Sequence, residues 1–207
     1  MRPRRVFLAR HGETEWNLLH RLQGRTDTPL SPLGEAHAEA LAALLGDEPL
    51  AAIYTSTLCR TRDTARPLGQ VRRLEVQARP ELDEMSYGIL EGHVAGDPDP
   101  LVQALWAERK ADPLGFRAPG GETYAELQSR LAPFVAEIGA RHARDTVLIV
   151  GHRATNRVLW GLLLGRSLEE CLTFKHKHDR VLEIRPGADP ECIEHRYAPV
   201  APPRRKA

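Results

Sequence analysis

The chain has 207 residues, of which 42% are hydrophobic, and its 29 Lys and Arg residues nearly balance 28 Asp and Glu. This balance argues against charge-driven binding to nucleic acid, which needs a strong basic excess, and no apolar run approaches the roughly 20 residues of a membrane helix. Three cysteines without a CxxC pair indicate a reduced chain without a disulfide framework, so we expect a cytoplasmic protein with no membrane partner.

The first 80 residues alternate between short apolar runs and helical patterns. The first helix is predicted to begin at Pro32, after the N-cap Ser31, and to stop near Gly46. A second helix is predicted over 58–68, ending near Pro67. Strands are predicted over 5–10, 50–56 and 73–78. The apolar face of the first helix is predicted to contain Leu33, Ala36, Ala40 and Leu44.

Residues 92–121 differ from the rest because they are rich in glycine and proline around one helical piece. This composition is typical of an insertion or lid over a site. Downstream, Thr123 and Glu126 form a capping box at the start of a long helix that reaches about residue 143. The remaining elements are a very apolar strand over 145–152, a helix over 154–165, and two weaker strands over 180–185 and 192–197.

Strands that alternate with helices and are apolar throughout predict a mostly parallel sheet covered on both faces. We therefore expect an α/β fold, a three-layer α/β/α sandwich with a lid-like insertion near 92–121. A single domain is predicted over 1–200, followed by a basic, disordered tail over 201–207. Ligands of such sheets bind beyond the carboxyl ends of the strands.

Two of the predicted strands end in a histidine. His11 follows the first strand together with Arg10, and His152 follows the strand over 145–152. Arg60 lies just beyond the strand that ends near Ser56. If these strands are parallel, the four side chains meet at one edge of the sheet. Such a concentration of cationic groups needs an anion, and the planar fork of arginine matches a phosphoryl dianion.

Nearby arginines keep an imidazole neutral, and a neutral imidazole can attack phosphorus to form a phosphohistidine. A leaving alkoxide then needs a proton, and a carboxyl beside a bound dianion can hold one near neutral pH. The segment "ELDEMSYGILEG" offers four carboxyl groups, Glu81, Asp83, Glu84 and Glu91. A zinc site built from His11, His152 and Glu84 is the main rival, but arginines beside a dication would be repelled.

Five segments resemble, in order, the motifs of the histidine phosphatase superfamily, which includes the cofactor-dependent phosphoglycerate mutases. They are "RHGETEWN", "LQGRTDTPLSPLG", "STLCRTRDTA", "ELDEMSYGILEG" and "LIVGHRAT", which together span about 6–160. The resemblance implies His11 as phosphate acceptor, Glu84 as proton donor and His152 as second catalytic histidine. It implies that the phosphate and its pocket are contacted by Arg10, Asn17, Gln23, Gly24 and Arg60.

This chain departs from the family pattern at two places. Arg153 follows the second histidine where glycine is frequent, and we expect its side chain to contact a substrate anion. After the donor, Met85 and Ala95 replace two cations that in the mutase motif would hold a phosphoglycerate carboxylate. We therefore predict a phosphomonoester hydrolase rather than its alternatives, a cofactor-dependent phosphoglycerate mutase or a non-catalytic phosphate-binding regulatory module.

The predicted enzyme needs no cofactor and no metal, and its partner is a small phosphorylated substrate. The physiological substrate and the oligomeric state are left open. His176 and His178 in "KHKHD" are interpreted as a solvated helix end or loop, with a metal site as the alternative. Cys59 is interpreted as a packed thiol, with a thiol whose pKa is lowered by the adjoining Arg60 as the alternative.

Overall fold

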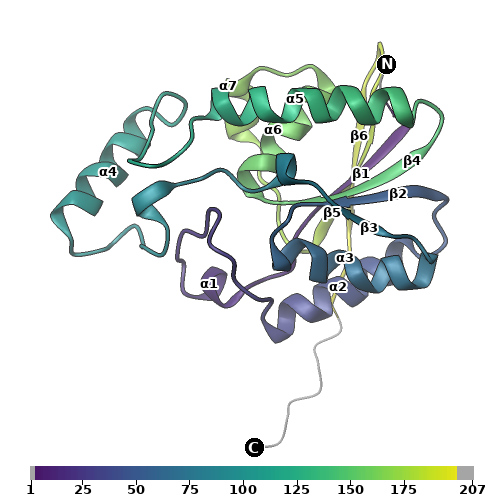
Figure 1. The fold of residues 1–207 in the computed structure, drawn as a ribbon, viewed down its shortest axis with the longest axis horizontal. Coiled ribbons are helices and arrows are strands. Elements are labelled where there is room, and N and C mark those ends of the chain that lie inside the picture. The colour runs from purple at the N-terminus through teal and green to yellow at the C-terminus, as the bar shows by residue number, and fades with distance from the viewer. Residues whose placement is uncertain (1–2, 200–207) are drawn as a thin grey trace, which may run out of the picture.

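A twisted six-stranded sheet runs through the middle of the computed structural model, which describes residues 3–199 (Figure 1). Its strand order is β3-β2-β4-β1-β5-β6. The first four of these strands are parallel, β5 runs antiparallel to β1, and β6 runs antiparallel to β5. The strands are β1 (Arg5–Arg10), β2 (Leu50–Thr55), β3 (Val76–Ala78), β4 (Thr146–Gly151), β5 (Arg180–Arg185) and β6 (Glu191–Arg196). The mostly parallel sheet was expected from the apolar strands, and the α/β class is confirmed.

Helices cover both faces of the sheet (Figure 1). On one face lie α2 (Pro32–Leu45) and α3 (Cys59–Arg72), and on the other α5 (Tyr124–Arg141), α6 (Arg153–Leu164) and α7 (Leu168–Thr173). Alternate residues of β1 enter separate cores: Phe7 packs in the cluster that contains Leu41 of α2, and Leu8 in the cluster that contains Leu127 of α5. The strand is therefore apolar on both faces, as a central strand of a three-layer sandwich requires.

The predicted insertion projects from one end of the sandwich (Figure 1). It contains α4 (Pro100–Ala111), which begins at the N-cap Asp99, and its inner face buries Val102 and Leu105 with Phe116. A short helix, α1 (Glu15–Leu18), lies at the same end of the molecule, and two 3₁₀ turns, η1 (Pro80–Leu82) and η2 (Gly88–Leu90), lead into the insertion.

The helix predicted to end near Pro67 continues for another turn, so that prediction is wrong. Pro67 lies inside α3, which ends at Arg72, with Arg73 as a left-handed cap at φ 52°. Buried Leu68 and Gly69 hold the last turn against the sheet, and this packing outweighs the backbone hydrogen bond that proline cannot donate. Strand β3 consequently begins only at Val76.

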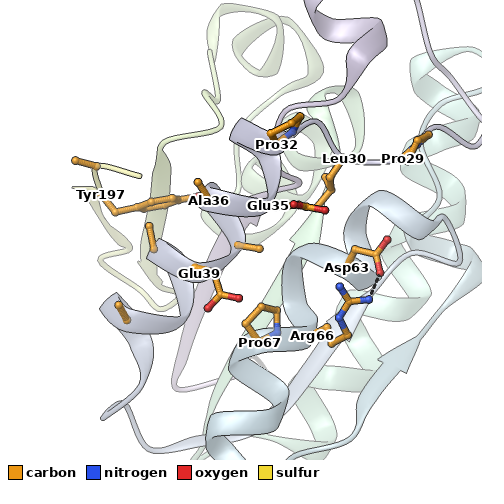
Figure 2. A pocket seen from close by; sticks show the side chains of 14 residues that line it. Pro29, Leu30, Pro32, Glu35, Ala36, Glu39, Asp63, Arg66, Pro67 and Tyr197 are labelled. Atoms are coloured by element: carbon orange, nitrogen blue, oxygen red, sulfur yellow. Dashed lines mark hydrogen bonds and ion pairs between the residues drawn. The ribbon is translucent and has the colours of Figure 1, made fainter. Parts of the chain in front are cut away.

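The apolar face predicted for α2 is not the face that packs on the sheet. The helix is turned by about a third of a circle from that prediction, and its buried residues include His37, Leu41 and Leu45. Leu33 and Leu44 are instead exposed. Ala36 and Ala40 line an external groove between α2, α3 and Tyr197, with Glu35, Glu39 and the Asp63–Arg66 ion pair at its margin (Figure 2).

The two ends of the domain prediction stay untested, because residues 1–2 and 200–207 lie outside the described part of the chain; the basic tail over 201–207 is among them. Within 3–199, no helix has both the length and the apolar character needed to cross a membrane.

The capping box at the start of α5 gives a test of the fold. Thr123 accepts the N–H of Glu126, and the Glu126 carboxylate accepts the N–H of Thr123. We expect Thr123→Ala to lower the free energy of unfolding by about 1 kcal/mol. Urea denaturation measures this, with Ser129→Ala on the exposed side of the same helix as control, expected to stay within about 0.5 kcal/mol of wild type. Equal losses in both variants would contradict this account.

Candidate active site

The two strand-end histidines face each other. β1 and β4 are adjacent and parallel, with Arg10 opposite Gly151, and the backbone N–H of His11 donates to the Gly151 carbonyl at 2.9 Å. The next residues along each strand are therefore neighbours, and the ring centroids of His11 and His152 lie 5.2 Å apart. The spatial arrangement expected from the strand pattern is present.

His11 is held through its Nδ1 atom, and no hydrogen bond to Nε2 is found within residues 3–199. Its Nδ1 lies 2.7 Å from the carbonyl of Gly12, which can only accept, so Nδ1 carries the proton and Nε2 keeps its lone pair. The ring is 3% exposed, and burial, followed by Arg60 and Arg10, lowers the pKa of His11 well below its ordinary value. A neutral imidazole with an available Nε2 is a nucleophile.

Gly12 has a packing reason to be glycine. A Cβ at this position would lie 2.4 Å from the carbonyl oxygen of Gly34, at the start of α2. Its N–H donates to Thr64 Oγ1 of α3 at 2.8 Å. The backbone after His11 is therefore pinned between two helices, which fixes the direction of the imidazole.

Arg60 joins three parts of the site, and its side chain is fully buried. Nη2 donates to the Gly24 carbonyl at 2.7 Å and Nη1 to the Thr26 carbonyl at 2.8 Å. Nε donates to His152 Nδ1 at 3.2 Å. Within the described chain, Arg60 forms no ion pair with a carboxylate, so its charge is available to an anion.

His152 lies behind His11 rather than on the cavity wall. Its Nδ1 accepts from Arg60, so Nε2 carries the proton and donates to Ser56 Oγ at 2.8 Å. Burial, followed by Arg60, lowers the pKa of His152 well below its ordinary value. With both nitrogens engaged by protein groups, this ring offers no lone pair to the predicted zinc rival. The described residues also contain no cluster of three or more His, Cys, Asp or Glu side chains arranged to hold a metal ion.

The structure separates the four candidate carboxyl groups. Glu81 pairs with Arg79, Asp83 accepts from the backbone and hydroxyl of Thr57, and Glu91 accepts from the backbone N–H groups of Arg25, Thr26 and Tyr87. Only Glu84 lines the cavity beside His11.

Glu84 is positioned by the first turn of α6. Its carboxylate accepts from the backbone N–H of Ala154 at 3.2 Å and of Thr155 at 3.0 Å, and from Thr155 Oγ1 at 3.1 Å. The N–H of Met85 adds a fourth hydrogen bond at 3.0 Å. These contacts hold the carboxyl group in one orientation at the wall of the cavity.

The cavity in front of His11 has a volume of about 420 Å³. The predicted residues that line it are Arg10, His11, Asn17, Gln23, Gly24, Arg60, Glu84 and Arg153. Sequence reasoning missed other lining residues: His20, Arg21 and Leu22, then Tyr87, Trp106, Arg109 and Arg157. The signal for Arg157 was its place one helical turn after Arg153. No motif marked Trp106 or Arg109.

Two predicted pocket residues owe their positions to local hydrogen bonds. Asn17 caps α1, where its Oδ1 accepts from the Thr14 backbone at 3.1 Å. Gln23 Oε1 accepts from Thr28 Oγ1 at 2.8 Å. Gly24 has φ +55°, and a Cβ there would lie 2.1 Å from the Glu91 carboxylate, so this turn requires glycine.

The cavity is strongly electropositive. Six arginines and one carboxylate, Glu84, line it, and the pKa of Arg10 falls to about 10, first because of burial and then because of Arg153. Like charges at such density repel unless an anion relieves them. The volume, the arginine forks and the neutral imidazole suit a phosphoryl group.

The loop expected for "KHKHD" is present, but its histidines are packed against the site instead of solvated. Among the described residues they also belong to no cluster of three or more side chains that could hold a metal ion. His176 is buried, with Nε2 bonded to the Arg180 carbonyl at 3.1 Å. His178 Nδ1 donates to the backbone carbonyl of His11 at 2.7 Å, and its ring lies 5.3 Å from that of His11. For Cys59 the alternative of a lowered pKa is wrong, because burial, followed by Asp27, raises the pKa of its thiol to about 11.

A three-layer α/β/α fold with a buried, neutral histidine in an arginine-lined hollow defines a phosphoryl-transfer protein of the phosphohistidine class. The model of the histidine phosphatase superfamily (branch 1) matches residues 6–195, and the chain belongs to that family.

Similar proteins include both phosphatases and a mutase-named protein. "Phosphoserine phosphatase 1" of Hydrogenobacter thermophilus is 33% identical over 82% of this chain and 81% of its own length. "Probable phosphoglycerate mutase GpmB" of Serratia proteamaculans is 30% identical over 94% of this chain and 86% of its own length. The crystal structure of the alpha-ribazole phosphatase from Shigella flexneri has a TM-score of 0.83 at 26% identity, covering 96% of both chains.

The buried neutral histidines predict acid sensitivity of the fold. Burial lowers the pKa of His176 to about 4, whereas an unfolded histidine titrates near 6.5. Below pH 6.5 the unfolded chain takes up protons that the folded chain cannot, so the free energy of unfolding falls as the pH falls. His176 alone accounts for a loss of about 2 kcal/mol between pH 7.5 and 5.0.

Urea denaturation at these two pH values tests the prediction. We expect His176→Gln, which keeps a neutral donor near the Arg180 carbonyl, to lose about 2 kcal/mol less stability on acidification than wild type does. His195→Gln on the partly exposed edge strand β6 is the control and should follow wild type. An unchanged difference between the two pH values in His176→Gln would contradict the assignment.

Proposed function

We propose that this protein hydrolyses phosphate monoesters of small metabolites through a phosphohistidine on His11. The single observation that supports this most is the free Nε2 of a neutral His11 inside the arginine-lined cavity. The first step takes place with Glu84 in its protonated form. Nε2 attacks phosphorus, the bond from phosphorus to the ester oxygen breaks, and that oxygen takes the proton of the Glu84 carboxyl group, which becomes a carboxylate. Arg10 and Arg60 stabilise the charge that spreads over the phosphoryl oxygens.

In the second step water replaces the alcohol. Glu84, now a carboxylate, accepts a proton from the water, the water oxygen bonds to phosphorus, and the P–N bond breaks. Inorganic phosphate leaves and His11 returns to its neutral form. The role that we propose for His152 is positioning, since it fixes the Arg60 guanidinium from behind through Nδ1.

Hydrolysis is favoured over mutase chemistry by the residues after the donor. Met85 is buried in the core rather than presented to the cavity, and Ala95 brings no charge to the insertion. A mutase must also hold its phosphorylated intermediate away from water. The name of the Hydrogenobacter relative agrees with hydrolysis, whereas the GpmB name keeps the mutase reaction as the alternative.

The central test is the fate of phosphate on His11. We expect His11→Ala to abolish turnover of 4-nitrophenyl phosphate, and wild type but not the variant to retain ³²P after an alkaline quench, in which phosphohistidine survives. His195→Ala, outside the cavity, serves as the matched control. Turnover of the His11 variant near the wild-type rate would rule out this mechanism.

Three further measurements separate the hydrolase from the rival functions. Activity that persists after chelator treatment would argue against a zinc enzyme. With 3-phosphoglycerate, release of inorganic phosphate indicates the hydrolase, and formation of 2-phosphoglycerate indicates the mutase. Ligand binding without any covalent label would favour a regulatory module.

The role of Glu84 is tested with esters that differ in their leaving groups. An alkoxide needs a proton in order to leave, whereas 4-nitrophenolate does not. We therefore expect Glu84→Gln to reduce kcat for an alkyl phosphate by roughly 10²- to 10⁴-fold and to reduce label formation from 4-nitrophenyl phosphate far less. Glu81→Gln, which changes a carboxylate outside the cavity, is the control. Equal losses on the two esters would contradict proton donation by Glu84.

A further inference from the structure

The peptide group between His11 and Gly12 is held at both of its polar ends. Its N–H, on Gly12, donates to Thr64 Oγ1 of α3 at 2.8 Å. Its carbonyl, on His11, accepts from His178 Nδ1 at 2.7 Å. The backbone beside the nucleophile is therefore fixed between α3 and the loop that precedes β5.

The orientation of this peptide group sets the direction of the imidazole. His11 Nδ1 lies 2.7 Å from the carbonyl of Gly12, the next residue along the chain. A rotation of the peptide group would carry that carbonyl away and release the ring, so that Nε2 would no longer keep its direction toward the cavity. Nucleophilic attack depends on such alignment, since a displacement of about 1 Å can cost roughly 100-fold in rate.

His178 contacts His11 in two ways, although it does not line the cavity. Besides the hydrogen bond, its ring stands edge-on to the His11 ring, with 5.3 Å between the two centroids. Burial, followed by Arg10, lowers the pKa of His178 to about 3, so its ring is neutral. It therefore donates its Nδ1 proton without placing a further positive charge beside the nucleophile.

The loop that carries His178 is itself anchored. Tyr197, which follows β6, donates from its hydroxyl to the His178 carbonyl at 2.6 Å, and its ring forms part of the groove wall shown in Figure 2. Two residues before His178, the His176 carbonyl accepts from Arg10 Nη1 at 3.2 Å. One loop therefore holds both the nucleophile and the arginine that precedes it.

We propose that His178 is a positioning residue for phosphoryl transfer: its hydrogen bond to the His11 carbonyl holds the imidazole in the orientation from which Nε2 attacks. Tyr197 supports this role by binding the His178 carbonyl. The inference rests on the proposed function for the identity of the nucleophile. It assigns a task to the "KHKHD" segment, which lies outside the five sequence motifs.

Replacement of the donor separates positioning from packing. His178→Phe keeps a ring beside His11 and removes the donor, whereas His178→Asn keeps an amide donor near the position of Nδ1. We expect His178→Phe to slow formation of the ³²P label on His11 from 4-nitrophenyl phosphate, measured in a single turnover, by roughly 10- to 100-fold. His178→Asn should restore most of that rate. Lys177→Gln, an exposed neighbour in the same loop, is the control and should form the label at the wild-type rate.

Ligand binding distinguishes a misdirected His11 from displaced arginines. Inorganic phosphate needs Arg10 and Arg60 but no bond to His11, so its Kd, measured by calorimetry, should stay near the wild-type value in His178→Phe. Orthovanadate reaches the five-coordinate geometry of the transition state by bonding to Nε2 of His11, so its affinity should fall in parallel with the rate of labelling. A general structural defect would weaken both ligands equally.

Tyr197→Phe is an independent variant that keeps the test decisive if His178→Phe does not fold. It removes only the hydroxyl that donates to the His178 carbonyl, and we expect it to slow labelling by a smaller factor. Labelling at the wild-type rate in the folded phenylalanine variants, equal rates in His178→Phe and His178→Asn, or equal weakening of phosphate and vanadate would each overturn the inference. Absence of the label from wild type would instead overturn the proposed function itself.

Discussion

The buried guanidinium of Arg60 is the contact on which the geometry of the site depends. Its nitrogens bind two carbonyls of the 24–26 loop and the ring of His152, so it joins the loop after α1, the start of α3 and the end of β4. Removing a charge from water is costly unless its donors are satisfied. Here neutral acceptors satisfy the N–H donors of Arg60. Its positive charge therefore stays uncompensated beside His11.

The same loop is held from its other side by Glu91. That carboxylate accepts from the backbone N–H of Arg25 at 3.0 Å and of Thr26 at 2.9 Å, while the Gly24 and Thr26 carbonyls accept from Arg60. The Glu91 carboxylate therefore binds the N–H groups of this loop, whereas the Arg60 guanidinium binds its carbonyl groups. Together the two side chains hold the loop in one conformation. Gly24 adopts a positive φ in this loop, and no side chain fits beside Glu91 at that position. Both facts require glycine.

Much of the sheet and of the phosphoryl site could be predicted, because strand-end positions follow directly from topology. Once β1 and β4 are taken as parallel, His11, His152 and Arg10 must meet, and Arg60 follows from its place after β2. The rest depends on tertiary packing that periodicity does not encode. Leu33 and Leu44 of α2 are exposed, and Pro67 lies within α3. In "KHKHD" the two lysines are exposed, whereas His176 is buried and His178 bonds to the His11 carbonyl. Arg109 was missed for the same reason: it reaches the cavity only through the fold of the insertion.

Arg109 and Arg157 come from different elements of one packed unit: Arg109 lies on α4 of the insertion and Arg157 on α6, and the apolar residues of α4 belong to the same core cluster as those of α6. Because the two guanidinium groups are carried by different helices, the shape of this side of the cavity depends on how α4 packs on the rest of the core. A substitution at Val102 or Leu105, far from any reacting atom, would therefore move Arg109 relative to His11.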